Sequence, residues 1–409
     1  MINVAIMGHG VVGSGVAEIL YNHPERIFEK AKENINIKYI LDLRDFEGLP
    51  YSDKFTKDFN LIVNDPEVQI VVEVMGGCTF AYDYVKACLL AGKSVCTSNK
   101  ELVAQKGCEL LNIALEKNVN FLFEASVGGG IPVLRPMAQC LTANEITEVT
   151  GILNGTTNFI LSRMIDDNMP FDDALKLAQQ LGYAEKDPTA DIEGFDACRK
   201  ICILASLGFG KHVYPNQVKT EGITGITLKD VEYANSFDSV IKLIGRTRKL
   251  DDGKITANVY PALVSKKHML SGVNDVFNAI MVRGDEVGDV MFYGRGAGKF
   301  PTASAVVGDV IDCAKHLTAR KYLYWEDGFE DYVADSTNDI TKLYIRVETK
   351  NFANSVEEIE TLFNNPSYIV SEDKSEIAIL TENDIEKTLL GQINSLNSCK
   401  VVKVLHAID

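Results

Sequence analysis

Four short segments of the chain hold residue types that can bind phosphates or move protons. The first is Gly8-His9-Gly10-Val11-Val12-Gly13, a G-x-G-x-x-G pattern between a short apolar run and a helical pattern. Gly8 would allow the tight turn, Gly10 would let the backbone approach a pyrophosphate, and Gly13 would let the helix pack on the strand. The positive end of the helix dipole also favours phosphates. We therefore expect this turn to bind a dinucleotide and His9 to face solvent.

The residue that would contact the adenosine ribose is ambiguous. The second strand-like pattern ends in Leu41-Asp42-Leu43-Arg44-Asp45. A carboxylate there would accept a hydrogen bond from the 2′-hydroxyl of NAD, whereas Arg44 would bind the 2′-phosphate of NADP. Both alternatives stay open, and use of both cofactors is compatible with the pattern.

Two polar segments follow strand-like patterns. Thr97-Ser98-Asn99-Lys100 would lie at the carboxyl end of a strand, where open α/β sheets bind ligands. A helix N-cap formed by Ser98 or Asn99 explains this segment equally well. The segment 151–159 could present backbone and hydroxyl donors at a helix start, and a simple capped turn is an equally good interpretation.

The fourth segment, residues 182–200, gathers many charges before and inside a helical pattern. Asp196 and Lys200 are four residues apart, so they share one helix face. A surface ion pair is the commoner arrangement. However, Ile201, Ile203 and Leu204 give the same helix a substantial apolar face, which favours a pair at a buried margin.

The elements that must position these residues change along the chain. Strand patterns at residues 3–7, 35–41, 70–74, 94–97 and 120–124 alternate with helical patterns at 11–20 and 82–91. This alternation is typical of a doubly wound Rossmann-type sheet. Strands at 146–153, 254–264 and 287–293, with helices at 158–166, 171–181 and 195–208, predict a mixed α+β domain.

The last part of the chain has a third pattern. Its order is β-α-β-β-α-β, the ferredoxin-like arrangement, after a polar linker at residues 334–339. We therefore predict an α/β protein with a nucleotide-binding domain (residues 1–135 and a returning helix at about 300–322). A substrate and dimerisation domain (136–299) and a small C-terminal domain (338–409) would follow.

Composition excludes several classes of protein. The 409 residues carry 41 Lys and Arg against 57 Asp and Glu, a net charge of −16 that disfavours nucleic-acid binding. We expect no membrane span, no signal peptide and no domain ahead of the nucleotide-binding fold. Nine cysteines without C-x-x-C spacing indicate a reducing compartment, the cytoplasm, and argue against a zinc site.

The motifs together resemble the homoserine dehydrogenase family. The resemblance rests on GHGVVG at residue 8, SNKELVA at 98, EASVGGGIPVLRP at 124, GILNGTTNFIL at 151, GYAEKDPTADIEGFDACRK at 182 and GRGAGKFPTASAVVGD at 294. These run in the family's order over most of residues 1–320. The resemblance implies NAD(P)-dependent interconversion of L-homoserine, a primary alcohol, and L-aspartate 4-semialdehyde in threonine, methionine and isoleucine biosynthesis.

The resemblance also implies roles for individual residues. Lys200 matches the family's proton donor and acceptor, Asp196 the acid that orients it, and Lys100 a polarising group beside the nicotinamide. An ordinary lysine pKa of about 10.4 leaves the side chain as ammonium at neutral pH, which suits aldehyde reduction. Glu185 and Asp191 match substrate contacts. We expect Tyr183 and Thr157 to add hydroxyl contacts to the substrate. Ser98 and Gly298 match cofactor contacts.

Three more expectations follow from the resemblance. Glu124 with the backbone carbonyls of Val127, Gly129 and Ile131 matches a Na⁺ loop, although a glycine-rich hinge is an equal alternative. A homodimer or homotetramer is implied. The C-terminal domain resembles an ACT-type regulatory domain with an amino-acid effector, but residues 348–354 lack the Pro-Gly pair common in such domains.

Two other functions remain open on the sequence. One is a related NAD(P)-dependent oxidoreductase that acts on another amino acid or semialdehyde, which a substrate panel would detect. The other is a non-catalytic sensor of nucleotide and amino acid. The presence of Lys100, Glu185, Asp196 and Lys200 weighs against the sensor.

Overall fold

The computed structural model describes residues 1–319 and 321–409, which form two compact units. Unit 1 comprises Met1–Val149, Cys202–Asn216 and Ile280–Phe329. Unit 2 comprises Thr150–Ile201, Gln217–Ala279 and Glu330–Asp409. This division differs from the three domains expected from the sequence, because the C-terminal segment clusters with the middle of the chain.

Unit 1 is built on a six-stranded parallel sheet in the order β3-β2-β1-β4-β5-β6. The strands are β1 (Ile2–Met7), β2 (Ile35–Leu41), β3 (Phe55–Thr56), β4 (Val68–Glu73), β5 (Ser94–Thr97) and β6 (Phe121–Leu122). This order is that of a dinucleotide-binding sheet: β1, β2 and β3 are added toward one edge, and β4, β5 and β6 are then added toward the other edge. The prediction of a Rossmann-type fold is confirmed.

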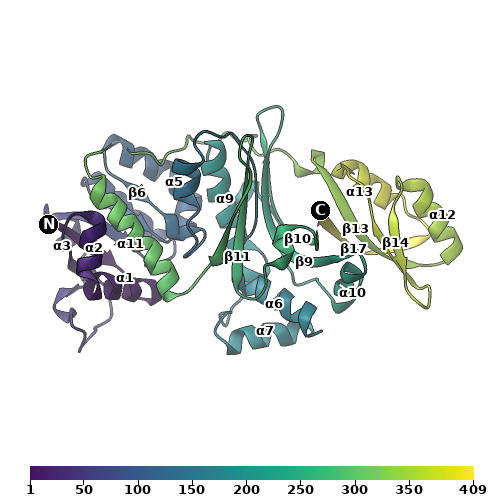
Figure 1. Cartoon of the computed structure of the whole chain (residues 1–409), viewed down its shortest axis with the longest axis horizontal. Coiled ribbons are helices and arrows are strands. Elements are labelled where there is room, and N and C mark those ends of the chain that lie inside the picture. The colour runs from purple at the N-terminus through teal and green to yellow at the C-terminus, as the bar shows by residue number, and fades with distance from the viewer. Residues whose placement is uncertain (320) are drawn as a thin grey trace. The chain divides into compact units, whose positions relative to one another are not determined.

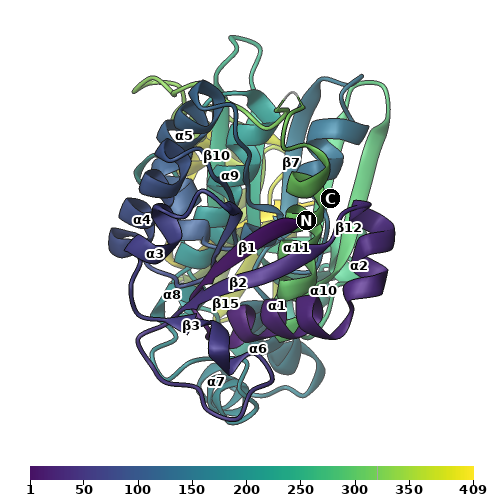
Figure 2. The same cartoon turned by 90° about the vertical axis from the view of Figure 1, so that its left-hand side faces the viewer.

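Helices cover both faces of this sheet (Figure 2). One layer contains α1 (Val11–Asn22), α2 (Pro24–Ala31) and α11 (Lys299–Lys315), and the other α3 (Asn60–Val63), α4 (Thr79–Leu90) and α5 (Lys100–Glu116). Gly15 allows α1 and α11 to approach closely, since a Cβ there would lie 2.9 Å from the Cβ of Ala303. The ammonium of Lys299 also lies 2.7 Å from Glu18 on α1. Helix α11 is thus the returning helix expected from the sequence.

Unit 1 also contains β12 (Gly288–Arg295), most of β11 (Phe277–Gly284) and most of β7 (Ile146–Ile152). Its only tryptophan, Trp325, is buried and donates from Nε1 to Nδ1 of His212 at 2.9 Å. The other ring nitrogen of His212 lies 3.0 Å from the carbonyl of Ala104. Burial lowers the pKa of His212, which therefore stays neutral at pH 7.

Unit 2 is built on a mixed sheet that includes β9 (Ser239–Lys249), β10 (Ile255–Ser265), β17 (Cys399–Ile408), β13 (Ile340–Thr349), β15 (Glu376–Leu380) and β14 (Ser367–Val370), in that order. Two-residue strands β8 (Lys219–Thr220) and β16 (Asp384–Ile385) pair at its margins. The helices are α6 (Gly155–Asp166), α7 (Phe171–Gln180), α8 (Thr189–Ile192), α10 (Leu228–Ser236), α12 (Phe352–Leu362) and α13 (Glu386–Asn394). Helix α9 (Phe195–Phe209) begins in unit 2, and its residues from Cys202 on belong to unit 1. The sequence patterns missed β9 because its residues are buried on both faces and show no alternation.

The C-terminal segment has the predicted β-α-β-β-α-β order, and Figure 1 shows α12 and α13 beside its strands. Strand β17 pairs antiparallel with β13 and parallel with β10, where Ala262 lies opposite His406. The His406 ring stacks on Tyr260 with the centroids 3.9 Å apart. The ferredoxin-like segment therefore continues the sheet of unit 2 from β10.

The expected polar linker is an ordered connection. Residues Ser336–Asn338 form a short helical turn capped by Asp335, and Ser336 is buried. Asp339 accepts a hydrogen bond from Arg248 at 2.8 Å. The role of residues 334–339 as a linker between domains stays a prediction, and an ion pair to β9 anchors the end of this segment. In the described part of the chain, no helix combines the length and the apolar character needed to cross a membrane.

Candidate functional site

The glycine-rich turn between β1 and α1 has the geometry of a phosphate-binding turn. Gly8 has a φ of +99°, and a Cβ there would lie 3.0 Å from the carbonyl oxygen of Val74. A Cβ on Gly13 would lie 2.0 Å from the carbonyl oxygen of Gly8. Beside Gly10, by contrast, no atom lies within 4 Å of the position of a Cβ, and no side chain caps α1. The turn therefore leaves room and helix N–H groups for an anion, so it fits a dinucleotide.

The end of β2 places Asp42 and Arg44 beside this turn. Asp42 Oδ2 accepts from the backbone N–H of His9 at 2.8 Å and from Arg44 Nη2 at 2.9 Å, and Asp42 Oδ1 accepts from Arg44 Nε at 3.0 Å. The Arg44 side chain holds the pKa of Asp42 well below its usual range. Because the guanidinium is largely exposed, it can contact a ligand while it neutralises Asp42.

The expectation that His9 faces solvent was wrong. His9 is buried, and its ring packs edge-on against Phe46, Phe55 and Tyr51, with the centroids of His9 and Phe46 4.5 Å apart. Burial lowers the pKa of this imidazole. Aromatic residues far along the chain cover His9, and the local turn pattern could not reveal them.

The end of β5 leads directly into α5. Asn99 is the N-cap, and its Oδ1 accepts from the backbone N–H of Leu102 at 3.1 Å. Lys100 is therefore the first residue of the helix, and both Ser98 and Lys100 are partly exposed. The capping interpretation of this segment is confirmed, and it places Lys100 at the carboxyl edge of the sheet, where ligands bind.

The glycine-containing turn before α11 packs against the glycine-rich loop at residues 128–130. Gly298, with a φ of +122°, is the N-cap of α11. A Cβ on Gly129 would lie 2.3 Å from the carbonyl oxygen of Gly296, and one on Gly130 would lie 2.7 Å from Pro301. The loop at residues 128–130 is therefore glycine-rich because it packs closely on the turn that begins α11.

The carboxylate of Glu124 already accepts hydrogen bonds from the backbone that follows this loop. It accepts backbone hydrogen bonds from Val133 at 2.6 Å, Leu134 at 2.8 Å and Arg135 at 2.7 Å. Its own N–H donates to Asp309, which also pairs with Arg135. Among residues 1–319 and 321–409, no three His, Cys, Asp or Glu side chains form a metal-binding group. The cation site of Glu124, Val127, Gly129 and Ile131 stays a prediction, for which backbone carbonyls are the suitable ligands.

In unit 2, the start of α6 brings together two acids from a distant segment. Asn154 is the N-cap of α6, and its Oδ1 accepts from the backbone N–H of Thr157 at 2.8 Å. Its Nδ2 donates to Asp191 at 2.7 Å and to Asp196 at 2.8 Å. The predicted pair of acids therefore meets at one amide. The sequence analysis did not single out Asn154, although an asparagine directly before a helix start is a capping signal.

Lys200 lies at the same cluster. Its Nζ is 2.8 Å from Asp196 Oδ2 and donates to the carbonyl oxygen of Leu153 at 2.7 Å. Lys200 and Asp196 are both buried, as the apolar face of α9 predicted. The Asp196 carboxylate and the Leu153 carbonyl oxygen thus both hold the Lys200 ammonium, beside the start of α6.

The other predicted substrate contacts differ in exposure. Tyr183 and Glu185 are exposed, and the carbonyl oxygen of Tyr183 accepts from Thr156 at 2.6 Å. Thr157 is fully buried, and its hydroxyl lies 3.0 Å from Asn154 Oδ1. The assignment of Thr157 as a substrate contact stays a prediction.

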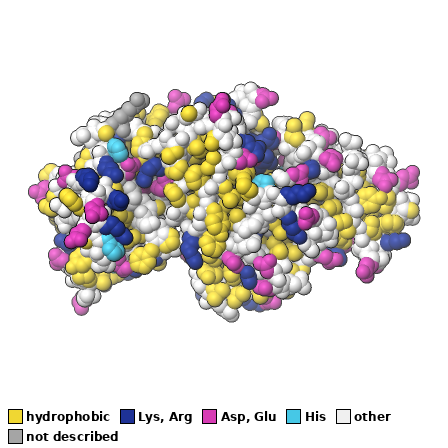
Figure 3. All heavy atoms as spheres, in the orientation of Figure 1, with side chains coloured by type: hydrophobic (Ala, Val, Ile, Leu, Met, Phe, Trp, Pro, Cys, Tyr) yellow, Lys and Arg dark blue, Asp and Glu magenta, His cyan; other side chains and the backbone are white. Residues whose placement is uncertain are grey.

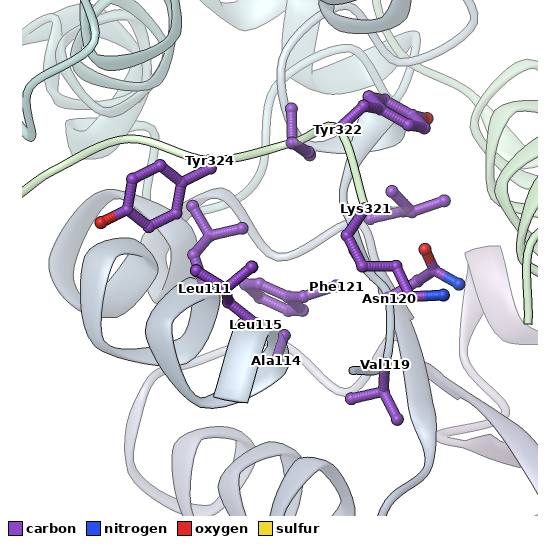
Figure 4. Close-up of a pocket in the computed structure, with 11 residues that line it drawn as sticks. Leu111, Ala114, Leu115, Val119, Asn120, Phe121, Lys321, Tyr322 and Tyr324 are labelled. Atoms are coloured by element: carbon purple, nitrogen blue, oxygen red, sulfur yellow. The ribbon is translucent and has the colours of Figure 1, made fainter. Parts of the chain in front are cut away.

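Two pockets of the structure lie apart from these residues. The pocket in Figure 4, between α5 and residues 321–324, has a volume of about 20 Å³, which suits a single water molecule. A larger hollow of about 760 Å³ lies among α6, α10 and β9. Neither pocket is lined by a predicted site residue.

Comparisons with known proteins extend over nearly the whole chain. Residues 8–124 match the family "Homoserine dehydrogenase, NAD binding domain", and residues 132–311 match the family "Homoserine dehydrogenase". Homoserine dehydrogenase of Bacillus subtilis is 36% identical over 98% of this chain and 96% of its own length. That of Synechocystis is 44% identical over 78% of this chain and 74% of its own.

Solved structures agree with these relatives. A homoserine dehydrogenase from Thiobacillus denitrificans superposes with a TM-score of 0.90 at 36% identity, covering 100% of this chain and 98% of that one. A hyperthermophilic archaeal homoserine dehydrogenase mutant in complex with NADPH has a TM-score of 0.66 at 30% identity, covering 76% and 97%.

The parallel sheet with its open glycine turn, together with the match to an NAD-binding family, defines an NAD(P)-dependent oxidoreductase. Within that class, the extent and level of identity decide the family. The chain belongs to the homoserine dehydrogenase family.

Proposed function

We propose that Lys200 transfers the proton while homoserine and aspartate 4-semialdehyde are interconverted. The cofactor, when bound, supplies or accepts the hydride. Lys200 is held by Asp196 and the Leu153 carbonyl, which stabilise its ammonium form. An ammonium can protonate the oxygen that forms when the aldehyde is reduced. In the opposite direction the lysine must first lose its proton, so oxidation is favoured at high pH.

Lys100 is proposed to polarise the same oxygen. Its position as the first residue of α5, at the carboxyl edge of the parallel sheet, supports this role. Lys100 belongs to unit 1 and Lys200 to unit 2, and their convergence on one oxygen stays a prediction.

The substrate ammonium and carboxylate need partners of their own. We propose Glu185 and Asp191 for the ammonium, with Tyr183 as a hydroxyl contact. Asp191 is held by Asn154, which fixes its carboxylate near Asp196. Thr157, whose hydroxyl lies 3.0 Å from Asn154 Oδ1, is proposed as a second hydroxyl contact.

For the cofactor we propose that the turn Gly8–Gly13, Ser98 and Gly298 contact the dinucleotide. NADP is favoured by the exposed guanidinium of Arg44, which already neutralises Asp42. A 2′-phosphate would therefore meet a positive group instead of an unpaired carboxylate. The relative solved with NADPH supports the same choice.

The remaining proposals concern assembly and location. Figure 3 shows hydrophobic side chains gathered over β11 and β12, where Met291 and Tyr293 are exposed. We propose that this face pairs in a homodimer or homotetramer, which light scattering after gel filtration would test. All nine cysteines are free, which supports a cytoplasmic location. Activity with and without threonine tests the ferredoxin-like segment for an effector.

The cluster of Lys200, Asp196 and Asn154 is the observation that carries the proposal. Purified protein with homoserine and NADP or NAD should produce reduced cofactor, measured at 340 nm. Lys200→Met should abolish this activity while NADPH binding, followed by fluorescence, is retained. A fully active Lys200→Met variant would refute the assignment, and activity on a different alcohol only would refute the substrate.

A further inference from the structure

A carboxylate lies at the end of the central strand β4, outside the set of residues that the motifs identified. Glu73 is the last residue of β4, and its side chain is completely buried. Its Oε1 accepts from the backbone N–H groups of Met75 at 2.8 Å and Gly76 at 3.3 Å. Its Oε2 accepts from the hydroxyl of Thr97, the last residue of β5, at 2.6 Å. One side chain therefore joins the loops that follow two neighbouring strands.

These hydrogen bonds form a closed ring. Thr97 Oγ1 accepts from the backbone N–H of Asn99 at 2.9 Å, and Asn99 Nδ2 donates to the carbonyl oxygen of Gly77 at 2.6 Å. Gly77 follows Gly76, whose N–H returns to Glu73. The ring thus fixes the loop after β4 against the start of α5, where Asn99 is the N-cap and Lys100 the first residue.

The same loop also touches the phosphate-binding turn. A Cβ on Gly8 would lie 3.0 Å from the carbonyl oxygen of Val74, and one on Gly13 would lie 3.1 Å from the Val74 side chain. Gly76 and Gly77 have φ values of +80° and +70°, and no atom lies within 4 Å of a Cβ at either position. The ring therefore shapes an open strip of backbone beside the glycine turn, at the edge of the sheet where dinucleotides bind.

The chemistry of the ring suits a carboxylate at residue 73. The backbone groups of Met75 and Gly76 can only donate, and the Thr97 hydroxyl donates to Glu73 while its own oxygen accepts from Asn99. Both oxygens of the side chain therefore accept. A glutamine would present an acceptor to one loop and a donor to the other. Burial raises the pKa of Glu73, so the ring retains this group against a desolvation cost that an apolar residue would not incur.

We propose that Glu73 is a positioning residue for the cofactor: its carboxylate holds the loops after β4 and β5 together and so sets the backbone of Gly76 and Gly77 and the start of α5 for nicotinamide-dinucleotide binding. This inference rests on the proposed cofactor site. Glu73 acts through the two loops and contacts no reacting atom.

The test measures NADPH binding by fluorescence titration, which does not depend on turnover. Glu73→Gln and Thr97→Val should each raise the NADPH dissociation constant roughly tenfold, the effect of losing one hydrogen bond to a charged group. Thr97→Ser keeps the hydroxyl and should bind within about twofold of wild type. Glu109→Gln is the matched control, since it removes a carboxylate from α5 at its contacts with Tyr82 and Lys86.

Two outcomes would overturn the proposal. One is Glu73→Gln binding NADPH as tightly as Glu109→Gln does. The other is a loss of binding in Thr97→Ser equal to that in Thr97→Val. If Glu73→Gln does not fold, as judged by its thermal transition, the two Thr97 variants decide the question. Failure of the wild type to oxidise homoserine, with NADPH binding intact, would refute the proposed function and leave this test unaffected.

Discussion

Lys200 and Asp196 form a buried ion pair at 2.8 Å within one turn of α9, and Asn154 donates to the same carboxylate oxygen. An exposed i,i+4 pair contributes little, but a buried charge that loses its partner is costly. The pair therefore keeps the Lys200 ammonium in a fixed position, as a proton donor requires.

Asp196→Asn should keep the shape of this pair and remove its charge. We expect kcat for homoserine oxidation to fall by about 10²-fold or more, because the lysine loses its orienting carboxylate. NADPH affinity should stay within about twofold of wild type, since the pair belongs to unit 2 and the glycine turn to unit 1. Steady-state kinetics and fluorescence titration measure the two quantities. Unchanged kcat in Asp196→Asn would contradict the role of this residue.

Asn154→Ala should separate capping from catalysis. The variant loses an N-cap, which costs about 1 kcal/mol of stability, and also the amide that joins Asp191 to Asp196. We expect kcat/KM for homoserine to fall by roughly 10- to 100-fold, as for one or two lost hydrogen bonds to charged groups.

Asn351→Ala is the matched control for that variant. Asn351 caps α12 in the same way, accepting from the backbone N–H of Asn354 at 3.3 Å. It should lose a similar amount of stability and keep full activity. Equal activity losses in the two variants would mean that Asn154 acts only through stability.

Arg44→Ala should change the choice between NADP and NAD. The guanidinium is the positive group at the end of β2, and its removal leaves Asp42 as an unpaired carboxylate. We expect kcat/KM for NADP to fall roughly tenfold or more, with NAD affected less or improved, since charge-assisted hydrogen bonds contribute about 1.5–3 kcal/mol. Lys57→Ala, which removes an exposed partner of Asp45, is the control. A parallel loss for both cofactors would contradict a role in discrimination.

The sequence predicted well whatever depends on local patterns. The glycine turn follows from three glycines at fixed spacing, and β2 and β5 begin and end at the residues predicted for them, 35–41 and 94–97. The pair Asp196 and Lys200 follows from helical spacing alone. These features could be predicted because every residue involved lies within one turn or one strand.

Features that depend on distant residues could not be predicted. Asn154 reads locally as a cap, and its two acids lie 37 and 42 residues later. In the sequence, Glu73 is only the last residue of an apolar strand. Its hydrogen bond to Thr97 is visible only in the structure. The exposure of His9 was misjudged for the same reason, since Phe46 covers its ring. The ion pair of Arg248 with Asp339 likewise joins residues far apart in the sequence.

A buried lysine gives the fold a distinct dependence on pH. Lys242 on β9 is completely buried, and its Nζ donates to the carbonyl oxygen of Val273 at 2.7 Å and to the side chains of Asn158 and Asn274. Burial lowers the pKa of Lys242 from 10.5 to about 8, although the carboxylates of Asp166 and Asp275 oppose this shift. The ammonium is therefore retained in the fold at a cost.

The sign of the effect follows from proton binding. Between pH 8 and 10.5 the unfolded chain keeps a proton on Lys242 that the folded chain has released. Stability then rises with pH across this window relative to a variant that cannot titrate, by up to roughly 3 kcal/mol. Thermal unfolding of wild type and Lys242→Met at several pH values from 7 to about 10.5 measures the difference. Other titrating groups are shared by both proteins, so two parallel stability curves would mean that Lys242 titrates normally.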